Sequence, residues 1–356
     1  MNDVTLEPPD GAGVRSRAAG RFLAVFAISM VTMLVAMILL PHDKYLRYLG
    51  LTDRYDARAH WVYERIHFDP TPIDVAFIGS SRTGRSVNTV RLEADLSRRG
   101  MTAKAVNLFM YKEGRDMQYV IAKELLEHRR VRLLVLEITE LEDRKSHPDF
   151  AFLADTPDVL LAPIFINVNY FANLAHLPGR QVDLFVQTSL DRFGLRHAQF
   201  APSFYLGSNR DVTEYLEVDG KRHYFSDENS LDKMERLRRA QESQITPPLL
   251  PGRFNWLEYR LPRYYVQCIL DLAAQHHTAV VFLYLPRYGG PLASAFYGQY
   301  AERYALLNPA VPLIANFRFW SDENHLNSGG AQLATDAIAD MLVDGGYLRP
   351  AESLGQ

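Results

Sequence analysis

Two short segments near opposite ends of this chain carry the residue types of nucleophilic catalysis. Gly79-Ser80-Ser81 follows the apolar run 73–78, and Asp322 and His325 lie three residues apart in a polar loop. A serine on a sharp turn after a strand can present its hydroxyl at the start of the next helix, where backbone N–H groups can stabilise an oxyanion. A carboxylate beside an imidazole orients it to take the serine proton. Ser81, His325 and Asp322 are therefore candidates for a nucleophile, its base and an orienting acid, although each segment taken alone is only suggestive.

Each segment taken alone has a second interpretation. The serines are also suited to capping the helix of a plain strand–helix loop, and Asn327 and Ser328 to capping the last helix. Residues 79–86 also match the phosphate-binding pattern G-x-x-x-x-G-K-[ST], except that Arg85 replaces the lysine. Arginine is not a neutral replacement for that compact charge, and this alternative leaves the aspartate and histidine unexplained. We therefore favour the triad.

The elements that must position these residues follow from the spacing of apolar residues. Short apolar runs predict strands, and spacings of three to four residues predict helices. The expected strands cover 73–78, 103–108, 131–138, 278–285 and 312–317, and the expected helices 90–99, 117–128, 256–276, 292–307 and 330–343. This alternation predicts a doubly wound α/β fold. Ser81 then stands at the carboxyl end of a strand, where open α/β sheets bind ligands.

The two motifs resemble those of the SGNH hydrolase superfamily, which has Gly-x-Ser after its first strand and Asp-x-x-His before its last helix. Position by position, Ser81 falls on the nucleophile, Asp322 on the orienting acid and His325 on the general base. The chain has Gly79-Ser80-Ser81 where the superfamily usually has Gly-Asp-Ser, and in this it resembles a membrane-anchored branch of the superfamily. That branch includes the D-alanyl transfer proteins of teichoic acid modification and looks similar to the alginate O-acetylation proteins. The resemblance implies about five parallel strands in flavodoxin-like order, with helices on both faces.

The oxyanion motifs depart from the family pattern. The family has a glycine after the second strand and an asparagine after the third, and the third strand here lacks a Gly-x-Asn. The backbone N–H of Ser81 is the expected oxyanion donor. Asn107, Gly114 and Arg82 are further candidates for oxyanion or substrate contacts. Glu137 is expected to bind Arg82 or to contact substrate, without a catalytic role.

A membrane anchor is expected near the N-terminus. Residues 22–40 carry no charge, and a helix of that length spans about 28 Å, close to the thickness of a bilayer core. A signal peptide is the alternative, but the run ends in Leu40-Pro41-His42, which is a poor cleavage site. Basic residues on the two sides are nearly balanced. We expect 1–21 in the cytoplasm and the remaining chain in the periplasm or another extracytoplasmic space.

The rest of the chain divides by pattern. Residues 41–69 are expected to be a juxtamembrane segment with a helix over 55–66. The α/β domain is expected to comprise 70–145 and 255–356. The aromatic-rich stretch 146–254 interrupts the alternation and is expected to be an insertion that serves as a lid or substrate wall, its rings stacking on sugars. The alternative is an elaboration that packs on the core.

Composition excludes several classes of function. The 356 residues carry 39 Lys and Arg against 42 Asp and Glu, so no basic excess points to nucleic acid. The lone Cys268 excludes an intramolecular disulfide and a zinc site built on cysteines. No histidine pair has a convincing metal spacing, so we expect neither a metal nor another cofactor.

The resemblance implies transfer of a small acyl group, acetyl first among them, through a Ser81 acyl-enzyme to an exported polysaccharide or cell-envelope polymer. Proteins of the anchored branch work beside a membrane-bound O-acyltransferase, so such a partner is expected. Two alternatives stay open. The same triad can hydrolyse esters as a carbohydrate acetylesterase or deacetylase, and a non-catalytic polymer-binding or assembly subunit can keep the same fold.

Overall fold

The computed structural model describes residues 11–51, 57–140, 142, 144–196, 198–218, 221–225, 229–244 and 249–348. Within these residues a five-stranded parallel sheet has the order β2-β1-β3-β6-β7. The strands are β1 (Val75–Ile78), β2 (Ala105–Asn107), β3 (Leu133–Ile138), β6 (Ala279–Tyr284) and β7 (Leu306–Leu307). Counted within the sheet, this is the flavodoxin-like order 2-1-3-4-5. The expected parallel α/β sheet is therefore confirmed.

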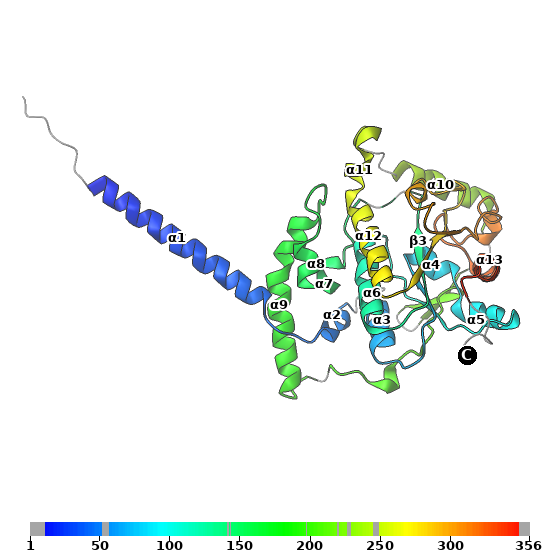
Figure 1. The fold of residues 1–356 in the computed structure, drawn as a ribbon, viewed down its shortest axis with the longest axis horizontal. Coiled ribbons are helices and arrows are strands. Elements are labelled where there is room, and N and C mark those ends of the chain that lie inside the picture. The colour runs from blue at the N-terminus through cyan, green and yellow to red at the C-terminus, as the bar shows by residue number, and fades with distance from the viewer. Residues whose placement is uncertain are drawn as a thin grey trace, which may run out of the picture.

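Helices cover both faces of the sheet (Figure 1). They include α3 (Ala57–His67), α5 (Thr89–Arg98), α6 (Arg115–His128), α12 (Arg260–Gln275) and α13 (Ser328–Asp344). Alternate strand residues point to opposite faces. Ile78 and Leu136 therefore pack in one core with α3, α6 and α12, whereas Phe77 and Val135 pack in another with α5 and α13.

Two sequence predictions around the fifth strand are wrong. The expected strand 312–317 consists of turns up to the start of η4 (Phe317–Phe319), and the expected helix 292–307 contains only the short η3 (Tyr297–Gln299). The fifth strand is instead β7, at the end of that expected helix. Tyr300 and Tyr304 pack on Phe282 of the neighbouring strand, which fixes an irregular chain there. Such tertiary packing overrides the local apolar pattern, which is ambiguous in short runs.

The juxtamembrane segment joins the core of the α/β domain. It contains α2 (Tyr45–Leu49) and α3, and the first two residues of the helix expected over 55–66 lie outside the described residues. Trp61 and Ile66 of α3 are fully buried against the sheet core. The helix expected over 256–276 is divided into α11 (Asn255–Glu258) and α12, with Tyr259 between them outside helical geometry.

One helix in the described part of the chain is long and apolar enough to cross a membrane. Helix α1 (Gly11–Ile38) contains this stretch at 19–38, and none of its apolar window is buried. The helix ends two residues before the expected limit at Leu40. It projects from the domain and meets it beside α9 (Tyr170–Arg192) (Figure 1). A single-pass anchor is thus supported by length, composition and exposure.

The stretch 146–254 has two parts, which we name by position. The anchor-side half, 150–196, holds α7 (Phe150–Leu153), α8 (Thr156–Leu160) and α9. The site-side half, 207–244, holds the antiparallel pair β4 (Tyr215–Val218) and β5 (Lys221–Tyr224), followed by α10 (Leu231–Gln244). Two short 3-10 helices complete the stretch, η1 (Pro202–Phe204) and η2 (Gly252–Phe254).

Candidate active site

The fold brings the three expected triad residues together. Ser81 opens the short helix α4 (Ser81–Ser86) directly after β1, and His325 lies in the loop before α13. The Ser81 Oγ lies 2.8 Å from His325 Nε2. The Nδ1 of His325 lies 2.8 and 2.9 Å from the two carboxylate oxygens of Asp322. These contacts form a continuous hydrogen-bonded chain between side chains from opposite ends of the sequence.

The surroundings of Asp322 favour its ionised form. Burial by itself raises the pKa of this carboxyl. The hydrogen bond and charge of His325, the N–H of Asn324 and the charge of Arg85 outweigh burial, so the pKa lies below its ordinary value. The carboxylate also accepts the backbone N–H of His325 at 2.9 Å. An anionic Asp322 holds a proton on Nδ1 and leaves Nε2 to accept from the serine hydroxyl.

Glu137 fixes the turn that carries the serine. In the β1–β3 register Ile78 pairs with Leu136, so the next residues, Gly79 and Glu137, lie side by side. The fully buried Glu137 accepts the Ser80 N–H at 3.0 Å, the Thr83 N–H at 3.1 Å and the Thr83 hydroxyl through one oxygen. A Cβ on Gly79 would lie 2.6 Å from that oxygen. The turn therefore requires glycine next to this carboxylate.

The Ser81 N–H remains available at this turn. Its neighbours are occupied, because the Ser80 and Thr83 N–H groups donate to Glu137 and the Arg82 N–H donates to the Ser80 Oγ at 3.2 Å. Within the described chain, no oxygen accepts from the Ser81 N–H at hydrogen-bond distance. This arrangement suits the predicted oxyanion donor.

Asn107 and Gly114 have structural neighbours. The Asn107 amide donates to the carbonyls of Thr83 at 3.0 Å and Val87 at 3.1 Å, so both of its hydrogens hold the end of α4. A Cβ on Gly114 would lie 2.6 Å from the Cβ of His147, so the absence of a side chain permits that close packing. We therefore do not include either residue among the oxyanion donors that we propose.

Arg82 ties α4 to the carboxyl edge of the sheet. Its guanidinium pairs with Glu140 at 2.6 Å and Glu113 at 3.2 Å, and it donates to the Leu285 carbonyl at 3.3 Å. The expected hydrogen-bonded partner, Glu137, binds the serine turn instead. The buried Arg82 therefore pairs with Glu140 and Glu113 of the protein, and not with the residue that the sequence predicts.

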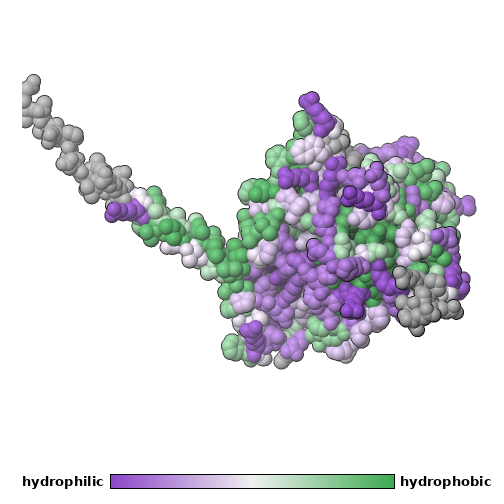
Figure 2. All heavy atoms as spheres, in the orientation of Figure 1, coloured by the Kyte–Doolittle hydropathy of each residue, from purple (hydrophilic) through white to green (hydrophobic). Residues whose placement is uncertain are grey.

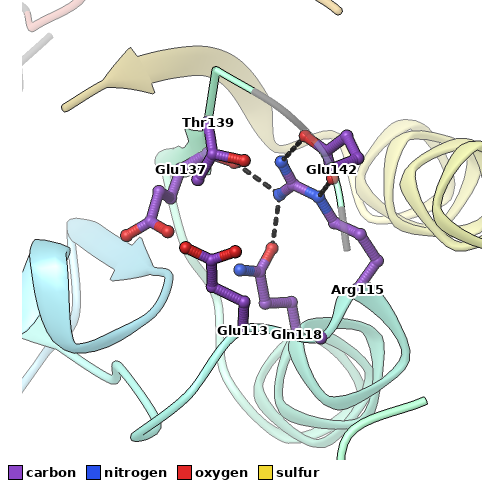
Figure 3. A pocket seen from close by; sticks show the side chains of 7 residues that line it. Glu113, Arg115, Gln118, Glu137, Thr139 and Glu142 are labelled. Carbon is purple, nitrogen blue, oxygen red and sulfur yellow. Dashed lines mark hydrogen bonds and ion pairs between the residues drawn. The ribbon is translucent and has the colours of Figure 1, made fainter. Parts of the chain in front are cut away.

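A small cavity lies within the same charged network (Figure 3). Its volume is about 10 Å³, and Glu113 and Glu137 contribute to its lining. On another side Arg115 binds both oxygens of Glu142 and donates to Gln118. Burial raises the pKa of Glu113 to about 7, with the neighbouring carboxylates adding to the shift and Arg82 opposing it. The network therefore holds a carboxyl that titrates near neutral pH.

Arg85 faces the histidine loop. It donates to the Ser321 hydroxyl at 3.0 Å and the Leu326 carbonyl at 3.2 Å, and its guanidinium lies over the Phe225 ring. Burial lowers its pKa to about 10, against the opposing charge of Asp322, so it stays cationic at neutral pH. The residue that replaces the lysine of a phosphate loop thus supports the loop of the triad, which argues against that alternative.

The site-side half supports the same loop. Met234 of α10 is fully buried in a cluster with Trp320 and Leu326, which flank the histidine. Asn229 donates to the Trp320 carbonyl. Neither Phe225 nor Met234 was singled out from the sequence, because nothing local links them to a loop about ninety residues away. Glu137, by contrast, could be noticed from the sequence, because it is an acidic residue inside the apolar run of β3.

The aromatic residues of the stretch 146–254 do not gather at one place. Phe225 reaches the triad loop through Arg85. Phe171 and Phe185 are exposed on α9, which lies across the domain from α4 and α13 in Figure 1. Stacking of rings from this stretch on sugars stays a prediction. The exposed rings of α9 lie away from the triad, and the Phe225 ring packs on Arg85.

The triad is open to solvent on one side. Ser81 is half-buried, and the side chains of His325 and Asp322 are 23% and 39% exposed. A group of His67, Glu124 and His128 elsewhere has ligand atoms close enough to hold a metal ion. The ammonium of Lys44, however, pairs with the same Glu124 carboxylate. We assign no metal to this group, because a cation already balances its charge.

No family model matches the chain, and no curated protein matches it. The resemblance to the SGNH superfamily therefore depends on the two sequence motifs. The fold and the hydrogen-bonded triad are consistent with that resemblance.

Proposed function

We propose that this protein is a membrane-anchored serine enzyme of SGNH type that transfers acyl groups. The observation that carries the proposal is the hydrogen-bonded chain from Ser81 through His325 to Asp322. Such a chain converts a weak hydroxyl into a nucleophile by giving its proton a positioned acceptor. The Ser81 N–H, which has no acceptor among the described residues, and the fixed turn around it support the same proposal.

In the first step the Ser81 Oγ forms a bond to the carbonyl carbon of an ester or thioester. His325 Nε2 takes the hydroxyl proton, and Asp322 stabilises the resulting imidazolium. The oxyanion of the tetrahedral intermediate accepts from the Ser81 N–H. The carbonyl re-forms as the bond to the alcohol or thiol breaks, and His325 gives its proton to that leaving group.

In the second step a hydroxyl of the acceptor attacks the acyl-enzyme. His325 takes the acceptor's proton, the new ester bond forms, and the bond to Ser81 breaks as the proton returns to its Oγ. The resemblance supports acetyl as the acyl group and an exported polysaccharide or cell-envelope polymer as acceptor. It also supports an extracytoplasmic catalytic domain and a membrane-bound O-acyltransferase as partner, and α1 supplies the anchor that this arrangement needs.

Hydrolysis is the second candidate function. The 23% exposure of the His325 side chain allows water to reach the base, which favours a carbohydrate acetylesterase in the absence of an acceptor. Incubation with an acetyl ester and an oligosaccharide acceptor separates the two. Acetylated oligosaccharide is the product of transfer, and free acetate alone is the product of hydrolysis.

The triad is tested by labelling the full chain in detergent with a fluorophosphonate serine probe. We expect labelling of the parent and its loss in Ser81→Ala and His325→Ala. Ser189→Ala is the matched control, because Ser189 lies on α9 and its hydroxyl donates to the Phe185 carbonyl of the same helix. A cooperative thermal transition shows that the parent is folded. If the folded parent is not labelled, the enzyme proposal is overturned, and a non-catalytic polymer-binding or assembly subunit is favoured.

A further inference from the structure

Helix α9 has two apolar faces although only one is buried. Its inner face packs on the domain through Leu177 and Leu184. On the outer face Phe171 and Val186 are 71% and 46% exposed, and Phe193, the C-cap residue directly after the helix, is 80% exposed. With Phe185 these residues recur at helical spacing and form one exposed stripe along the helix. The inner face accounts for the fold, so the outer stripe needs another explanation.

Further apolar side chains extend this stripe. Exposed members in the chain before and after α9 are Leu160, Leu161, Ile164, Phe165, Val168 and Leu195. Figure 2 shows hydrophobic surface where α1 meets the domain and along the edge above and below that junction. Scattered apolar residues are normal on a soluble surface, whereas a continuous patch marks a place of interaction.

Helix α1 identifies what lies against this patch. The Gln181 amide donates to the Ile38 carbonyl at 3.0 Å, and the Asp43 N–H donates to the Thr188 hydroxyl at 2.9 Å. The first bond joins the last residue of α1, where the membrane-spanning stretch ends, to the middle of α9, and the second joins the segment after α1 to the C-terminal part of α9. A bilayer crossed by α1 therefore has its surface at the level of α9. The exposed Arg192, beside Phe193, is placed to reach lipid headgroups.

We propose that α9 is an interfacial membrane helix, whose outer face inserts into the boundary between lipid headgroups and acyl chains. The protein then has two membrane contacts, the crossing helix α1 and the surface helix α9. This proposal depends on α1 crossing the bilayer and not on the chemistry of the triad.

The orientation has a consequence for the substrate. Helices α4 and α13, which adjoin the triad, lie on the side of the domain away from α9 (Figure 1). With α9 on the lipid, the triad, which adjoins α4 and α13, lies on the part of the domain away from the bilayer. Substrate then reaches Ser81 from the aqueous side or from a partner that rises above the membrane, and not from a lipid directly beneath the site.

Spin labelling of the full chain in phosphatidylcholine–phosphatidylglycerol vesicles tests the proposal. On a Cys268→Ser background, single cysteines replace Phe185, Phe193, Val31 or Val90 and receive a nitroxide. Val31 of α1 reports the bilayer, and Val90, 57% exposed on α5, is the water-facing control. Collision with oxygen relative to a water-soluble nickel complex measures contact with lipid. We expect this ratio at 185 and 193 to exceed that at 90 several-fold.

Three outcomes overturn the proposal. A ratio at 185 and 193 equal to that at 90 places α9 in water. Exclusion of both reagents shows that protein, either a second copy or a partner, covers the stripe. A water-like ratio at 31 shows that α1 does not cross the bilayer. Circular dichroism melts of each labelled variant confirm folding without reference to activity, so failure here is distinct from failure of the proposed enzyme.

Discussion

The two halves of the stretch 146–254 serve opposite edges of the molecule. The anchor-side half packs α9 against the domain with its inner face and leaves an apolar outer face beside α1. The site-side half places Asn229 and Met234 against the loop of the histidine, and Phe225 against Arg85, which bonds that loop. One interruption of the α/β fold thus supplies both an exposed apolar helix face beside α1 and a support for the loop of His325.

The two halves differ in what they contact, although each combines buried apolar side chains with hydrogen bonds. The site-side half supports the histidine loop through Phe225 under Arg85, a hydrogen bond to the Trp320 carbonyl and the buried Met234. The anchor-side half packs on the domain through Leu177 and bonds the end of α1 through Gln181. We therefore expect substitutions in the site-side half to slow the reaction of the triad. Substitutions in the anchor-side half should lower stability or weaken membrane contact.

The largest effect is expected at the triad itself. Asp322→Asn removes the charge that holds the imidazole in its productive tautomer, and should lower the labelling rate on the order of 10⁴-fold. The rate of reaction with the fluorophosphonate probe measures this loss. Glu323→Gln, which changes a neighbouring carboxylate, is the control and should react like the parent. An Asp322→Asn protein that reacts at the parent rate would remove the aspartate from the mechanism.

The next prediction compares one buried residue from each half. Met234→Ala and Leu177→Ala each empty a site that is 0% exposed, and each should lower the free energy of unfolding by about 2–5 kcal/mol. Only Met234→Ala should also slow labelling, because Met234 packs on Trp320 and Leu326 beside His325. Denaturant unfolding and probe kinetics are measured on the same samples. Equal slowing in the two variants would contradict the division between the halves.

A smaller effect is expected from Glu113. Burial raises its pKa to about 7 in the folded protein, above its ordinary value near 4.5. The folded state therefore binds more protons than the unfolded state between these values, and stability falls as pH rises from about 4.5 to 7. Glu113→Gln should flatten this part of a plot of melting temperature against pH. A plot that keeps its slope in the variant assigns the dependence to another group.

The smallest effect is expected on the outer face of α9. Phe171→Ser changes a side chain that is 71% exposed, so the free energy of unfolding in detergent should change by no more than about 0.5 kcal/mol. The labelling rate should equal that of the parent. A loss of 2 kcal/mol or more would show that Phe171 packs within the fold, and the stripe would then be part of the core.

Much of the sheet could be predicted from local pattern. β1, β2, β3 and β6 lie inside the expected strands, because each is an apolar run bounded by polar residues or turns. β7 was missed, since two residues carry no periodic signal and its place depends on pairing with Phe282 and Leu283. The triad residues could be predicted because Gly-x-Ser after a strand and Asp-x-x-His before a helix are local motifs, which together resemble the SGNH layout.

The partners of charged residues could not be predicted in the same way. Arg82 pairs with Glu140 and Glu113, and Glu137 holds the turn of the serine. Each pairing depends on which strand ends become neighbours and in what register. Local patterns carry no information on either.

The sequence by itself determined the apolar anchor, the alternation of strands and helices, and the positions of Ser81 and His325 next to element ends. These features can be recognised from hydrophobic periodicity and residue type within a short stretch of sequence. The tertiary structure alone decided that the serine meets the histidine at 2.8 Å, that Arg85 supports their loop and that α9 has a second, exposed apolar face. These features arise between segments up to 244 residues apart, where only packing of the whole chain sets distance and direction.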